Sequence, residues 1–166
     1  MTANPTQRLR DLGITLPAAP GSAGAYVQTV FSGDLVFTAG QIAVDGDRGL
    51  IAAGKAGAEV DIETATACAR QCALNILAQL QDALGTLNRI VRVVKLTVFV
   101  ASDPDFTQQP VVANGASQLI ADVLGEAGIH CRSAIGVAAL PLDSPVEVEA
   151  TVEVRSEPIA EDDALT

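Results

Sequence analysis

The chain has 166 residues, the length of one domain, and 49% of them are hydrophobic, as in folded globular proteins rather than disordered ones. Its formal net charge is -10, and its ten lysines and arginines are scattered singly, which disfavours binding to nucleic acid. No secretory signal opens the sequence and no stretch reaches the roughly 18 apolar residues of a membrane span, so we expect a cytoplasmic protein with reduced cysteines and no membrane partner.

The two ends of the chain differ in composition from the part between them. Residues 4–13 (NPTQRLRDLG) predict a short capped helix, and a connector rich in proline and glycine follows it. Residues 156–166 form an acidic tail that we expect to be mobile. The prediction is therefore an N-terminal extension over residues 1–23, a single domain over 24–155 and the tail.

A β-hairpin is predicted at the start of the domain. Residues 25–31 and 35–44 flank the turn sequence Ser-Gly-Asp, and a loop rich in glycine and aspartate occupies residues 45–61. Within this loop, residues 49–56 imitate a phosphate-binding P-loop. Ala56 stands where that motif needs a hydroxyl for magnesium, so we expect a mobile loop and no nucleotide cofactor.

Helices and strands alternate over the rest of the domain. Apolar residues recur at three- and four-residue steps over residues 62–87, which indicates an amphipathic helix. The next predicted elements are a strand at 93–100, a helix from 109 or 110 to 124, and strands at 133–140 and 146–154.

The order ββαβαββ predicts an α+β fold in which two helices cover one face of a single mixed sheet. Several strands carry apolar or small residues on both faces. The second face would then be a large apolar surface, and we expect self-association to bury it.

The cysteines and the single histidine could be combined into a zinc site on paper. However, Cys68 and Cys72 lie on the apolar stripe of the first long helix, where cysteine acts as a small hydrophobic residue. We therefore expect no metal, with Cys68 and Cys72 in the core and His130 at the surface. With only one histidine, nothing in the sequence indicates a nucleophile–base pair of the serine or cysteine type.

Arg132 stands at the start of a predicted strand made of small and apolar residues. It shares its face of that strand with Ala134, Gly136 and Ala138, which leave space beside the guanidinium. A permanently charged, bidentate donor beside a space is suited to hold a small carboxylate. An ordinary ion pair at the surface or between subunits is the alternative.

The last predicted strand alternates strictly between valine and polar residues. Glu147, Glu149, Thr151 and Glu153 share one face of it. A solvated acidic face is one interpretation of this pattern. The other is that one of these acids, placed near a subunit boundary, acts as a base.

Several motifs, in this order and with these separations, resemble the YjgF/RidA family, formerly called the L-PSP endoribonuclease family, from Gly24 to Val154. The motifs are GAYVQ (24–28), VFTAGQI (36–42), VKLTVFV (94–100), Arg132-Ser133, Leu140-Pro141 and VEVEA (146–150). The resemblance implies a chorismate-mutase-like α+β fold and a homotrimer whose sheets form a central barrel, with ligand clefts between subunits.

The resemblance also implies an activity, namely hydrolytic deamination of reactive 2-imino and enamine acids to 2-oxo acids and ammonia without a cofactor. Arg132 matches the family's carboxylate-binding arginine, Glu147 its water-activating acid and Tyr26 its pocket tyrosine. Three further positions match residues that line the pocket: Gly40, Asn114 and Ala134. A small carboxylate would be the substrate.

The chain departs from the family pattern after the arginine. Ala134 stands where cysteine is usual, Gly136 replaces a glutamate, and Ala139 replaces a basic residue. These changes indicate a larger and less polar cleft. The alternative to an imine deaminase is therefore a non-catalytic protein that binds a carboxylated metabolite at the same clefts, and the sequence leaves enzymatic activity open.

Overall fold

The computed structural model describes residues 4–155. Its helices are α1 (Pro5–Asp11), α2 (Ile62–Leu84) and α3 (Gln109–Leu124). Its strands are β1 (Thr29–Ser32), β2 (Leu35–Thr38), β3 (Gln41–Ile42), β4 (Ile90–Ala101), β5 (Cys131–Val137) and β6 (Val146–Val154). The acidic tail predicted at 156–166 lies outside the described residues.

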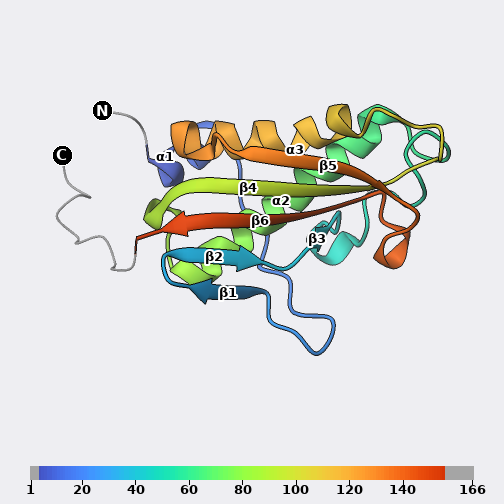
Figure 1. The fold of residues 1–166 in the computed structure, drawn as a ribbon. Helices are drawn as coiled ribbons and strands as arrows, with labels where there is room; N and C mark the ends of the chain where they lie inside the picture. Colours follow the sequence, from blue (N-terminus) through green and yellow to red (C-terminus); the bar gives the residue numbers. More distant parts are fainter. Residues whose placement is uncertain (1–3, 156–166) are drawn as a thin grey trace.

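One mixed sheet organises the domain. The strand order is β1-β2-β6-β4-β5, and β3 also pairs with β6. The β4–β5 pair is parallel because α3 crosses between these strands, and the other pairs are antiparallel. Helices α2 and α3 lie together on one face of the sheet, and α1 packs on α3 (Figure 1). The predicted α+β class, mixed sheet and helix-covered face are confirmed.

Element ends differ from the prediction mainly in the first hairpin. The first strand begins only at Thr29, and the second is broken at Ala39–Gly40 into β2 and β3. At this break Thr38 Oγ1 accepts a hydrogen bond from the Ala150 amide at 3.0 Å, and the backbone pairing with β6 resumes at Gln41. Strand β5 ends at Val137 rather than 140, and α2 ends at Leu84 rather than 87.

The core lies between the sheet and the two long helices and is almost entirely aliphatic. Its largest fully buried side chains include Ile76, Leu77 and Leu80 from α2 and Leu96 from β4. Helix α3 approaches α2 closely at Gly115, where a Cβ atom would overlap the backbone oxygen of Thr66. None of the described helices has the length and apolarity needed to cross a membrane.

Two of the three cysteines belong to this core, as predicted. Cys68 and Cys72 are fully buried, whereas Cys131 is exposed on β5. Burial raises the pKa of Cys68 to about 11 and that of Cys72 well above its ordinary value, so both are neutral thiols near pH 7.

In residues 4–155, no three His, Cys, Asp or Glu side chains gather as metal ligands would.

Residues 49–56, which resemble a P-loop in sequence, form a loop whose last residue is held by backbone hydrogen bonds. Ala56 is fully buried, and its amide donates to the Ala101 carbonyl at 2.8 Å. The carbonyl of Ala56 in turn accepts from the Asp103 amide at 3.0 Å. The expected mobility therefore does not fit Ala56, which joins the loop to the end of β4.

The outer face of the sheet, opposite the helices, combines apolar and acidic side chains. Val30 and Phe37 are 52% and 42% exposed, and Ile135 at the other edge is 43% exposed. The glutamates of β6 alternate with buried valines and therefore point to this outer face. An apolar surface of this kind is what the expected self-association would cover.

Candidate functional site

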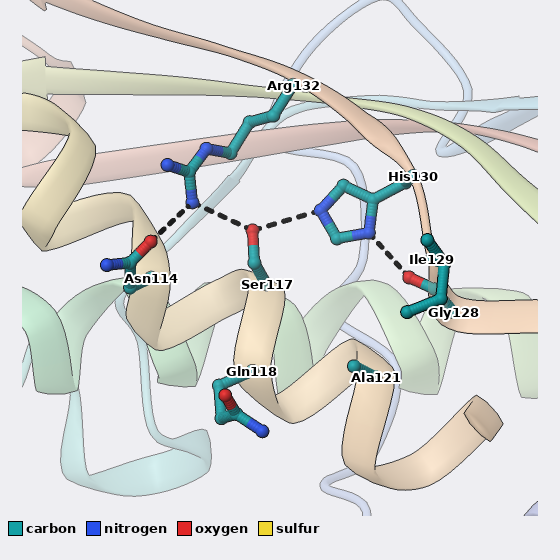
Figure 2. Close-up of a pocket in the computed structure, with 8 residues that line it drawn as sticks. All are labelled: Asn114, Ser117, Gln118, Ala121, Gly128, Ile129, His130 and Arg132. Atoms are coloured by element: carbon teal, nitrogen blue, oxygen red, sulfur yellow. Dashed lines mark hydrogen bonds between the residues drawn. The ribbon is translucent and has the colours of Figure 1, made fainter. Parts of the chain in front are cut away.

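Arg132 lies at the start of β5, and α3 holds its guanidinium in place. Nη1 donates to Asn114 Oδ1 at 3.0 Å and to Ser117 Oγ at 2.9 Å, and Nη2 donates to the Pro110 carbonyl at 3.1 Å (Figure 2). All three partners belong to one side of α3, so a single rigid helix fixes the guanidinium. The structure thus brings together Arg132 and Asn114, two residues predicted from sequence.

The three acceptors leave Arg132 with donors to spare. A guanidinium has five N–H groups, so the Nε group and one on Nη2 are left without an acceptor among residues 4–155. Its partners are all neutral, and neither ion pair found in this part of the chain includes Arg132. A fixed, uncompensated cation with two donors is suited to bind a carboxylate.

An open pocket of about 660 Å³ lies beside the guanidinium, between α3 and the start of β5 (Figure 2). Its lining residues are Asn114, Ser117, Gln118, Ala121, Gly128, Ile129, His130 and Arg132. Among these lining residues, Arg132 alone carries a permanent charge. The pocket is therefore electropositive at one end and apolar near Ala121 and Ile129.

The space beside Arg132 was predicted to come from the small residues of its own strand, but the observed pocket is lined mainly by α3 and the turn before β5. A Cβ atom on Gly136 would lie only 2.8 Å from Gln109 Nε2, so the first residue of α3 occupies the space predicted there. Ala134 packs against the core instead of lining an opening. In the single chain, the Gln109 side chain thus fills the space beside Gly136, and the enlarged cleft expected between subunits stays a prediction.

His130 was expected at the surface, and its observed position differs from this prediction. Its Nε2 lies 2.9 Å from Ser117 Oγ and its Nδ1 lies 2.6 Å from the Gly128 carbonyl oxygen, so it is a half-buried member of the pocket rather than a free surface residue (Figure 2). A serine–histidine pair, which the sequence did not indicate, is therefore present. Nothing in the sequence marks a single serine within a helix as functional. However, Ser117 comes one helical turn after Asn114, so both side chains could have been expected on the same side of α3.

Glu147 and Gly40 form a second group, on the outer face of the sheet. A Cβ atom on Gly40 would overlap the Glu147 carboxyl group, so this glycine makes room for the carboxyl where the chain passes from β2 to β3. Burial, together with the nearby charge of Glu149, raises the pKa of Glu147. A half-buried carboxylate with a raised pKa is a better proton acceptor than an exposed one.

The structure does not bring these two groups together within one chain. Arg132 and Ala150 both pair with Leu96 and face the helices, whereas Glu147 pairs with Phe99 and faces outward. Tyr26 lies before β1, at the sheet edge opposite β5, where its hydroxyl accepts from the Ala23 amide at 3.3 Å. Arg132 therefore lies on the helix-covered face at one edge of the sheet, Glu147 lies on the outer face, and Tyr26 lies near the opposite edge.

Comparison with known proteins relates the chain to one family. A sequence profile of the family described as Endoribonuclease L-PSP matches residues 16–154. Protein TCP17 of Trypanosoma cruzi is 49% identical over 149 residues, which cover 89% of this chain and 92% of that protein. A Salmonella typhimurium 2-iminobutanoate/2-iminopropanoate deaminase is 35% identical over 132 residues, covering 80% and 89%.

Among solved structures, the Agrobacterium tumefaciens protein Atu1372, described as of unknown function, superposes with a TM-score of 0.84 at 45% identity. The match covers 91% of this chain and 92% of that one. Both the fold and the sequence of the domain are therefore shared with these proteins over nearly its whole length.

Proposed function

Because the chain belongs to the endoribonuclease L-PSP family, also called YjgF/RidA, we propose that it hydrolyses reactive 2-imino acids to 2-oxo acids and ammonia. The observation that carries the proposal is Arg132, a guanidinium fixed by three neutral partners and left with two free N–H donors at an open pocket. The 35% identity to a protein named as such a deaminase supports the same chemistry.

Arg132 binds the substrate carboxylate in this proposal. Its two free N–H groups match the two oxygens of a carboxylate, and the three bonds to α3 remove the cost of ordering a long side chain on binding. A 2-imino acid held by its carboxylate exposes the adjacent imine carbon in a fixed orientation. Orientation contributes much of the rate when the substrate is already electrophilic.

Glu147 moves the protons. Its carboxylate takes a proton from water as the water oxygen bonds to the imine carbon, and the proton then passes to the nitrogen. As the C–N bond breaks, the new hydroxyl gives up its proton and becomes the carbonyl of the 2-oxo acid, and the nitrogen leaves as ammonia. The raised pKa of Glu147 favours its role as the base.

The complete site requires two chains. Arg132 faces the helices at the β5 edge, whereas Glu147, Gly40 and Tyr26 lie on the outer face or at the opposite edge. A homotrimer in which the β5 edge of one subunit meets the outer face of its neighbour would complete each cleft. The exposed Phe37 and Ile135 support such packing, since they lie on that face.

Carboxylate binding without turnover is the second candidate function. It is favoured by the division of the site, because a single chain already contains the whole Arg132 pocket, whereas Glu147, the base of the proposed imine hydrolysis, lies on the other face of the sheet. In that case the carboxylate would bind as a ligand. Ligand binding would raise the melting temperature without any loss of the bound compound.

Imine hydrolysis by the purified protein tests the proposal. Wild type is expected to accelerate the loss of 2-iminopropionate and 2-iminobutyrate, and Arg132→Ala to abolish the acceleration. The matched control is Arg92→Ala, which removes an exposed arginine that pairs with Glu153 at 3.3 Å, outside the pocket. No acceleration by folded wild type, combined with thermal stabilisation by 2-oxo acids, would establish the binding function instead.

A further inference from the structure

The hydrogen bonds of Ser117 and His130 define one protonation state of the pair. Nδ1 of His130 lies 2.6 Å from the carbonyl oxygen of Gly128, which can only accept, so Nδ1 carries the proton. In the neutral ring Nε2 then has a lone pair. Ser117 Oγ, 2.9 Å away, donates its hydrogen to that lone pair.

This is the arrangement of a nucleophile, its base and a group that orients the base. Arg132 adds a positive charge, since Nη1 donates to the same Oγ at 2.9 Å and stabilises negative charge there as the proton leaves. A hydroxyl oxygen has two lone pairs, and Arg132 uses one of them. The other is available to attack carbon, and Ser117 lines the open pocket through which a reagent can enter.

We propose that Ser117 is the nucleophile and His130 the general base of a hydrolytic site for esters that carry a carboxylate. Ser117 Oγ bonds to the ester carbonyl carbon while its proton passes to His130 Nε2. The C–O bond of the ester breaks, and the leaving alcohol takes that proton. Water then attacks the acyl-serine, gives a proton to Nε2, and releases the acid as Oγ recovers the proton.

The lining of the pocket selects the class of ester. The two free N–H groups of Arg132 bind a carboxylate, and the apolar end formed by Ala121 and Ile129 accommodates a small hydrocarbon part. All of these groups come from α3, β5 and the turn between them (Figure 2). Ester hydrolysis therefore needs one chain and not Glu147, unlike the proposed imine hydrolysis.

A fluorophosphonate probe, which reacts covalently with activated serines, tests the nucleophile directly. After incubation with the full-length protein, peptide mass spectrometry is expected to locate the adduct on Ser117. Labelling should be lost in Ser117→Ala and reduced at least about 100-fold in rate in His130→Gln. Ser133→Ala is the matched control, because this serine neighbours Arg132 on the opposite face of β5. Absence of labelling on Ser117 in folded wild type would overturn the proposal.

Two aryl esters test the role of the carboxylate. Wild type is expected to hydrolyse 4-acetoxybenzoate at least about tenfold faster, in kcat/KM, than its methyl ester, which lacks the charge. Equal rates, or rates unchanged in both Ser117→Ala and His130→Gln, would contradict the proposal. Glu147→Gln separates the two activities, since it is expected to remove imine hydrolysis while Ser117 is still labelled.

Discussion

At the scale of single residues, the site depends on what surrounds two charged groups rather than on the charges themselves. Arg132 is proposed to bind a carboxylate because three neutral acceptors fix it and leave donors free. Glu147 is proposed as the base because Gly40 leaves room for its carboxyl in a half-buried position. Sequence analysis singled out both charged residues and Gly40 as candidates, and their roles stay predictions. It did not single out Ser117 or His130 as a pair, because they meet only when α3 packs beside β5.

Gly40→Ala tests the position of the Glu147 carboxyl. The added Cβ overlaps the flexible end of a glutamate and not backbone, so the side chain can turn away at low cost. We expect a stability change under about 1 kcal/mol in urea unfolding, with a large loss of imine hydrolysis. Gly21→Ala is the matched control, because nothing lies within 4 Å of its added Cβ. Full activity of Gly40→Ala would contradict this role.

Glu147→Gln tests the raised pKa through stability. Because folding raises the pKa above the ordinary 4.5, the folded chain holds the proton more tightly than the unfolded one. Stability conferred by the protonated form is therefore lost as pH rises from about 4.5 through the raised value. The glutamine variant has no such loss, because its amide does not titrate. We expect Glu147→Gln to have the higher Tm at pH 7, and this advantage to shrink as the pH falls through the raised pKa and to be gone below about pH 4.5.

Glu153→Gln is the matched control for this experiment. It lies on the same face of β6 but instead removes the salt bridge to Arg92. We expect no rise of Tm for Glu153→Gln at pH 7. A Tm difference for Glu147→Gln that stays constant with pH would contradict the assigned burial of the Glu147 carboxyl.

At the scale of elements, regular periodicity predicted the fold well. The strict alternation of residues 146–154 gave β6 its observed bounds, and the three- and four-residue steps gave α2 its start and its buried stripe. The first hairpin was predicted, but the break in its second strand was not, because the Thr38–Ala150 hydrogen bond at the break is a tertiary contact. The filled space at Gly136 likewise depends on where α3 lies.

Gly115→Ala tests the close contact of α2 and α3. The added Cβ would overlap a backbone oxygen of Thr66, which cannot turn away as a side chain can. Alanine gains about 0.5–1 kcal/mol in helix propensity, but overpacking costs about 1–3 kcal/mol. We expect a net loss of about 1–2 kcal/mol in urea unfolding, against a change within about 0.5 kcal/mol for the exposed control Gln118→Ala. Unchanged stability of Gly115→Ala would contradict this packing.

At the scale of the whole molecule, the arrangement of the sheet explains why the proposed imine hydrolysis would need two chains. The β5 edge carries Arg132 toward the helices, and the outer face carries Glu147. Composition and strand patterns predicted self-association, and the exposed Phe37 and Ile135 are consistent with it. The homotrimer stays a prediction, because the number of subunits depends on the angle at which two copies meet.

Mixed oligomers test the shared cleft most directly. Arg132→Ala and Glu147→Gln chains, each inactive in imine hydrolysis, are co-expressed and purified through two different tags, so that only mixed oligomers are recovered. If each cleft takes Arg132 from one subunit and Glu147 from its neighbour, a mixed trimer has one intact cleft and hence about a third of wild-type activity. Mixed oligomers that stay as inactive as either parent, while the co-expressed wild type hydrolyses 2-iminopropionate, would contradict the two-chain site.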